Sequence, residues 1–95
     1  MISVFINNND GLHDLFATVT DLNTNPPSTP LNDQQVPFNN LRINHGTQAT
    51  AIVQEDGNGN CLLNIHTVSA DDATIQKDFD NQVAQSGQTI FVDVF

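Results

Sequence analysis

The clearest β-strand pattern in the chain lies in TQATAIVQEDGNGNCLLNIHTV, residues 47–68. Its two ends, residues 47–54 and 61–68, alternate between apolar and other side chains with a period of two, which is typical of a strand with one buried face. Between them lie Asp-Gly and Asn-Gly steps, the strongest short-range signals for a β-hairpin. The sequence therefore predicts two antiparallel strands joined as a hairpin.

Further strands are predicted on both sides of this stretch. Apolar or alternating runs occupy residues 2–6, 15–21, 41–44 and 88–95. Turn residues separate them, including the Asn-Asp-Gly run at 7–11, His45-Gly46 and Ser86-Gly87. Because the last run is strongly apolar, we expect it to take a central position in a sheet.

The stretch from 69 to 85 supports two interpretations. Ile75, Phe79 and Val83 are spaced by four residues, and Ser69 resembles a helix N-cap, so a short helix over 70–83 is one alternative. Residues 74–79 instead alternate as a strand would, followed by a turn at 80–82. Strong helix formers are sparse here, so a short strand with a loop is favoured.

The least regular stretch, residues 22–35, contains Pro26, Pro27 and Pro30 among polar residues. Proline lacks a backbone donor and disfavours regular pairing. We expect a long exposed loop here, the best candidate for a mobile or partner-facing segment.

Six or seven short strands separated by turns predict an all-β fold. The expected architecture is a small antiparallel β-sandwich of immunoglobulin-like type, forming a single domain over residues 1–95. Its most buried residues should include Ala51, Val53, Leu63, Ile65, Val92 and Val94. Most of the six phenylalanines, Phe5, Phe16, Phe38, Phe79, Phe91 and Phe95, are also expected in the core.

The charge of the chain restricts its partners. Arg42 and Lys77 are the only lysine or arginine residues, and the formal net charge is −9. Two cations cannot neutralise a nucleic-acid backbone or an anionic lipid surface, so nucleic-acid binding and membrane docking are not expected. The first residues resemble no secretory signal and no apolar run is long enough to span a bilayer, which predicts a cytoplasmic protein unless export uses a signal-less route.

No catalytic, cofactor-binding or metal-binding residue is assigned from the sequence. The loop around Gly59 has oxygen-bearing residues at three calcium-loop positions but Ile65 where an EF-hand needs its glutamate. The single cysteine, Cys61, is expected to be a small buried hydrophobe, and His13, His45 and His66 are too scattered for a zinc motif. A calcium site pooled from several loops stays open, with these residues as its candidates: Asp10, Asp14, Asp56, Asn58, Asp71, Asp72, Asp78 and Asp80.

Three segments of the chain resemble a known group of proteins. Residues 79–83 and 87–95, together with the opening Phe5-Ile6-Asn7-Asn8, are similar to small uncharacterised acidic β-domain proteins of Gram-negative bacteria such as Burkholderia. The resemblance implies no activity and no site residues. The sequence favours a non-catalytic protein-interaction or structural module, with a calcium-stabilised binding or adhesion-type module as the alternative and a small hydrolase-like enzyme as a distant third.

Overall fold

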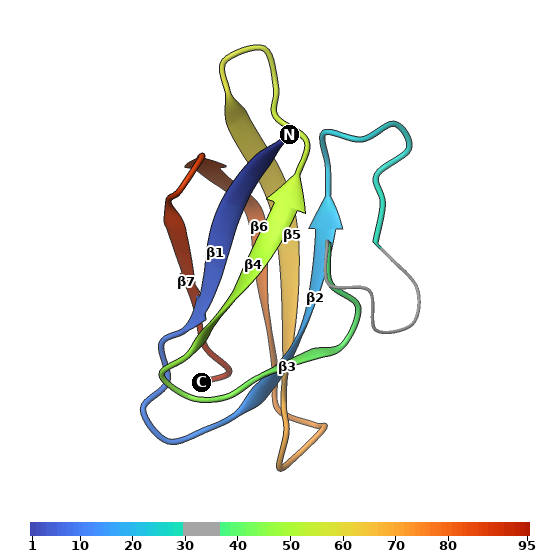
Figure 1. Cartoon of the computed structure of the whole chain (residues 1–95). Coiled ribbons are helices and arrows are strands. Elements are labelled where there is room, and N and C mark those ends of the chain that lie inside the picture. Colours follow the sequence, from blue (N-terminus) through green and yellow to red (C-terminus); the bar gives the residue numbers. More distant parts are fainter. Residues whose placement is uncertain (30–36) are drawn as a thin grey trace.

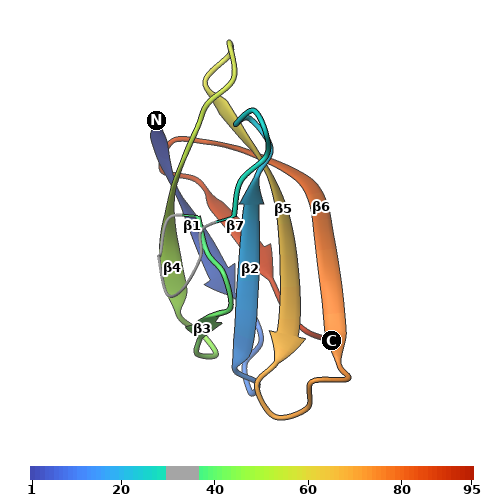
Figure 2. The same ribbon diagram turned by 90° about the vertical axis from the view of Figure 1, so that its right-hand side faces the viewer.

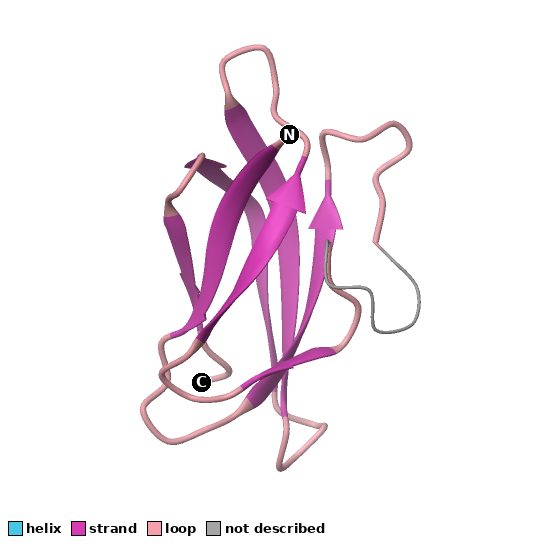
Figure 3. Cartoon of the chain, in the orientation of Figure 1, coloured by secondary structure: helices cyan, strands magenta, loops and turns pink. Residues whose placement is uncertain are grey.

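The computed structural model describes residues 1–29 and 37–95, and the part of the chain that it describes is all-β (Figures 1 and 3). Its strands are β1 (Ile2–Asn8), β2 (Leu15–Asp21), β3 (Leu41–Ile43), β4 (Gln48–Val53), β5 (Asn60–Ser69), β6 (Gln76–Gln85) and β7 (Thr89–Val92). The predicted fold class is therefore confirmed.

The strands form two sheets that face each other (Figure 2). One has three strands in the order β4-β1-β7, and the other has four in the order β3-β2-β5-β6. All pairs are antiparallel except β1 with β7, which is parallel. The immunoglobulin-like part of the prediction is not confirmed, because constant-type immunoglobulin domains would pair β1 with β2 and β6 with β7.

The period-two pattern of the strands builds the core. In β5, every second side chain from Cys61 is buried, and its neighbours on the other face are only partly covered. The six residues predicted as core, Ala51, Val53, Leu63, Ile65, Val92 and Val94, are all at most 2% exposed. The phenylalanine prediction was mostly wrong: only Phe38 is fully buried, while Phe91 and Phe95 are about 60% exposed. Phe91 occupies the outward phase of its strand, so its apolar character alone could not indicate its face.

The predicted hairpin between residues 47–54 and 61–68 is wrong. The two strands are confirmed, but β4 pairs with β1, whereas β5 pairs with β2 and β6 in the opposite sheet. The turn itself forms: Asp56 N–H donates to the Asn60 carbonyl at 2.8 Å, and the Asp56 carboxylate accepts from the N–H groups of Asn58 and Asn60. Local turn chemistry thus reverses the chain without deciding which strands pair.

Two buried polar residues help to tie the loops to the sandwich. Asp21 is 2% exposed and accepts hydrogen bonds from the backbone N–H groups of Asn23 and Gln54. Asn8 is fully buried and donates from its amide to the carbonyls of His13 and Ile43. Asp21 therefore links the end of β2 to the β4–β5 crossover, and Asn8 links the β1–β2 loop to β3.

The alternative of a short helix over 70–83 is wrong, since β6 runs as a strand from Gln76 to Gln85. The favoured strand prediction is correct, but the expected turn at 80–82 is a bulge within one long strand. The register with β5 shifts between Leu63 and Ile65, and Asn81 has a φ of 55°. Ser69 accepts from the N–H groups of Asp71 and Asp72 as a cap would, yet only a tight loop follows.

The remaining expectations concern β7 and the long loop. The predicted central position of the last strand is wrong, because among the described strands β7 lies at an edge and pairs with β1 alone. Of the loop predicted over 22–35, residues 22–29 are mostly exposed or partly exposed and carry an isolated bridge from Ser28 to Asp21. Residues 30–35 of that prediction lie outside the described part.

Candidate functional site

The outer face of the three-stranded sheet is the most distinctive surface of this protein. We call it the neutral face and define it by the outward side chains of β1, β4 and β7. They are Ser3, Phe5, Asn7, Gln48, Thr50, Ile52, Thr89 and Phe91. None carries a charge, on a chain whose formal net charge is −9. Figure 1 shows this sheet in front of the four-stranded one.

Strand register arranges the neutral face in rows. Phe5 lies between Thr50 of β4 and Thr89 of β7. Ile52 is opposite Ser3 near one end of β1, and Phe91 is opposite Asn7 near the other end. The large apolar side chains therefore follow a diagonal across the sheet, with Phe5 in the middle.

The apolar side chains at the two ends of this diagonal are open to solvent. Phe91 is 60% exposed and Ile52 is 41% exposed, while Phe5 is partly covered by its neighbours. Single exposed apolar residues are ordinary on protein surfaces, whereas a contiguous apolar patch rimmed by polar side chains is typical of an interaction site. The amides and hydroxyls of the remaining face residues provide such a rim.

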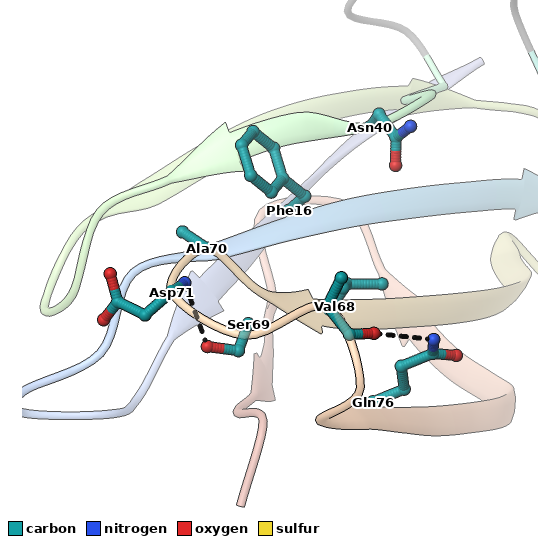
Figure 4. A pocket seen from close by; sticks show the side chains of 8 residues that line it. Phe16, Asn40, Val68, Ser69, Ala70, Asp71 and Gln76 are labelled. Atoms are coloured by element: carbon teal, nitrogen blue, oxygen red, sulfur yellow. Dashed lines mark hydrogen bonds between the residues drawn. The ribbon is translucent and has the colours of Figure 1, made fainter.

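The outer face of the four-stranded sheet has a different character. It carries Arg42, His66 and Asp78, and a shallow groove of about 570 Å³ lies beside them (Figure 4). The groove is lined by Phe16, Asn40, Val68, Ser69, Ala70, Asp71, Ala73 and Gln76. Asp71 is its one ionisable side chain, and the Ser69 hydroxyl accepts from the backbone N–H groups of Asp71 and Asp72 at the start of the loop.

Each basic side chain of the chain is matched with an aspartate. His13 lies 2.9 Å from Asp10, and the Lys77 ammonium lies 2.8 Å from Asp93. His66 pairs with Asp78 across the β5–β6 ladder. These pairs were not predicted from the sequence, because they depend on strand register and loop contacts.

Asp14 holds the densest of these clusters. Its carboxylate accepts from the His45 backbone N–H at 2.9 Å, contacts the His45 ring at 2.8 Å, and binds the Arg42 guanidinium at 2.8 Å. These hydrogen bonds, the backbone one first, lower the pKa of Asp14 from 3.8 to about 2. Asp14 is thus a permanently ionised anchor for the β3–β4 turn at neutral pH, which suits a structural role better than proton transfer.

The candidate calcium ligands come from several loops and strands. Asp10 and Asp14 lie in the β1–β2 loop, Asp56 and Asn58 in the β4–β5 crossover, and Asp78 and Asp80 on β6, while Asp71 and Asp72 follow β5. Within residues 1–29 and 37–95, no group of three or more His, Cys, Asp or Glu side chains is placed to hold a metal ion.

Three of these carboxylates already bond within their own loops. Asp10 accepts from the Leu12 N–H, Asp56 from the Asn60 N–H, and Asp72 from Thr74, and in each case these hydrogen bonds lower the pKa of the carboxyl group. They therefore stabilise turns as carboxylates, which is the ordinary role of aspartate at such positions.

Cys61 is fully buried, as expected from its apolar surroundings. Burial raises the pKa of its thiol above 9.0. A neutral, enclosed thiol is a poor nucleophile and a poor metal ligand, so Cys61 acts as a core residue.

Comparisons of the chain with models of protein families, with curated proteins and with solved structures find no match. Across the described residues, no helix is long and apolar enough to cross a membrane.

Proposed function

We propose that this chain is a non-catalytic protein-interaction module that contacts its partner through the neutral face. The observation that carries the proposal is the uncharged, partly apolar composition of this face on a strongly acidic chain. When a partner covers apolar groups that are exposed together, their removal from water lowers the free energy of the complex. Aromatic residues such as Phe5 and Phe91 are enriched at the centres of protein interfaces.

The rest of the described surface supports this choice. The acidic side chains lie in loops and on the other sheet, where charge favours solubility. The aspartate partners of Arg42 and Lys77 leave these cations poorly placed to bind an anionic ligand. The shallow groove contains no reactive pair, so binding through a flat face is better supported than chemistry in a cleft.

Site-specific photocrosslinking tests the proposal. A benzoylphenylalanine replaces Phe91 in one variant and Val83 in the other, because both residues are 60% exposed and they lie on different sheets. Each variant is expressed in the native host and irradiated. We expect a discrete protein adduct from position 91 and none from position 83.

The proposal distinguishes the two sheets, so the comparison between positions decides it. Equal labelling at both positions, or no adduct at position 91, would refute a role for the neutral face. The adduct is identified by mass spectrometry, which shows whether it contains another protein or a second copy of this chain.

A further inference from the structure

We propose that the occupant of the neutral face is a second copy of this chain, which forms a two-fold, face-to-face dimer. This inference rests on the proposed function and adds the identity of the partner. It follows from the charge distribution, from the diagonal of apolar residues and from the size of the face.

Because the neutral face is uncharged, it is better suited to self-association than an acidic surface of the same chain would be. Two copies with a net charge of −9 repel each other, and burying an acidic loop between them would add a desolvation cost. No side chain of the neutral face is charged, so a contact confined to this face buries no charge. A basic partner, by contrast, would be drawn to the acidic loops and would gain nothing electrostatic from this face.

The apolar diagonal is self-complementary under a two-fold axis. Phe5 lies at its centre, with Ile52 and Phe91 at opposite corners. Consider a two-fold axis that lies in the plane of the contact, perpendicular to the diagonal, and passes beside Phe5. This axis places Phe5 against Phe5 of the second copy, and Ile52 against Phe91 of the second copy. The same patch is then used by both subunits, as in most homodimers.

The size of the face predicts a weak dimer. Three strands spaced about 4.8 Å apart and about six residues long, at about 3.3 Å per residue, cover roughly 300 Å². This footprint is small compared with the roughly 800 Å² that each partner buries in a standard stable interface. The dimer should therefore dissociate readily at low protein concentration.

The proposed dimer should respond to salt in a characteristic direction. Salt screens the repulsion between two acidic molecules over about 10 Å at 0.1 M ionic strength. Because the neutral face has no ion pairs to weaken, added salt should strengthen the dimer. An interface between acidic and basic surfaces would respond in the opposite direction.

Sedimentation velocity of the full chain tests the inference. The wild-type protein is measured up to about 0.5 mM, in NaCl of about 0.02 M and about 0.5 M. We expect the average mass to rise towards a dimer with concentration, and to rise more at the higher salt. Phe91→Asp should weaken dimerisation about tenfold or more, because it places a charge in the contact.

Val83→Asp is the matched control, since it adds the same charge at a residue that is also 60% exposed but lies on the other sheet. This variant should dimerise like the wild type, and circular dichroism verifies that both variants are folded. A wild-type protein that stays monomeric at the highest concentration and salt would overturn the inference, as would an equal effect of the two variants. A crosslink from position 91 to a different protein, without dimerisation, would overturn this inference and leave the proposed function intact.

Discussion

Leu63 is an example of a single residue that stabilises the core between the two sheets. It is fully buried on β5, the strand that pairs with β2 on one side and β6 on the other. Its neighbour Leu62 points to the other face of the same strand and is only partly buried. Two adjacent leucines thus have different surroundings because successive side chains of a strand alternate between faces.

Replacing Leu63 with alanine should lower the free energy of unfolding by about 2–5 kcal/mol, from lost apolar burial and the cavity that remains. Leu62→Ala is the control and should cost clearly less. Equilibrium urea unfolding followed by circular dichroism measures both. A loss below about 1 kcal/mol for Leu63→Ala would mean that this face of β5 is not packed against a core.

The charge of the Asp14 carboxylate should make the stability of the fold depend on pH. The folded-state pKa is about 2, below the ordinary value of 3.8. A depressed carboxyl pKa contributes stability above the unfolded-state pKa, and this contribution disappears as the pH falls through the folded-state pKa. Asp14 should therefore stabilise the fold at neutral pH and lose this effect below pH 4.

Asp14→Asn tests that effect. The variant should be less stable than the wild type at neutral pH, and the difference should narrow as the pH falls from about 5 to about 2. Urea unfolding across this pH range measures the difference. A difference that stays constant with pH would show that the carboxylate charge does not contribute.

Among the strand elements, β6 depends on a bulge to stay continuous. Asn81 adopts a positive φ of 55°, and its N–H donates to the Asn64 side-chain oxygen at 3.0 Å. Asparagine tolerates this left-handed conformation better than most residues. The bulge re-registers β6 on β5, so that Phe79 and Ala84 both face the core.

Substitutions at Asn81 should follow backbone conformation. Asn81→Ala should destabilise the fold by about 1 kcal/mol because alanine tolerates the left-handed conformation less well than asparagine, and Asn81→Gly should be better tolerated. Thermal or urea unfolding compares the two. Equal stability of the alanine and glycine variants would argue against a left-handed residue at this point.

The β4–β5 crossover depends on a buried carboxylate, that of Asp21, for one of its hydrogen bonds. Asp21 links it to β2 by accepting from the partly buried N–H of Gln54 at 2.8 Å. Asp21→Ala should cost about 1–3 kcal/mol, since the donors lose their acceptor. Asp56→Ala removes an acceptor from an exposed turn and should cost less, which urea unfolding of both variants would establish.

For the whole molecule, the net charge of −9 governs the response to ions. Self-repulsion between acidic side chains destabilises the compact state, and salt screens it. Sodium and calcium at equal ionic strength should therefore raise the melting temperature alike. A specific calcium site would instead add about 2.7 kcal/mol when calcium stands at 100 times its Kd.

We expect no calcium excess, because the described acidic residues form no three-ligand cluster. Melting curves with about 2 mM calcium, with sodium at matched ionic strength and with chelator measure this. An upward shift of several degrees that only calcium produces, and that chelator reverses, would favour the calcium-stabilised module.

The strands and the buried face of β5 were predictable from sequence because period-two alternation and turn residues are local properties. The same local rules favoured a hairpin between β4 and β5, a central β7 and a mostly buried set of phenylalanines, and the structure contradicts all three. Strand partners are chosen by the burial of whole faces, which residues distant in the chain decide together.

The neutral face illustrates the same division at the scale of the molecule. Its eight residues come from three segments far apart in the sequence, and no local pattern connects Phe5, Ile52 and Phe91. Composition, charge and β-rich character follow directly from the order of the amino acids. That these uncharged side chains share one surface depends on the packing of distant segments, because pairing β1 with both β4 and β7 aligns their outward positions.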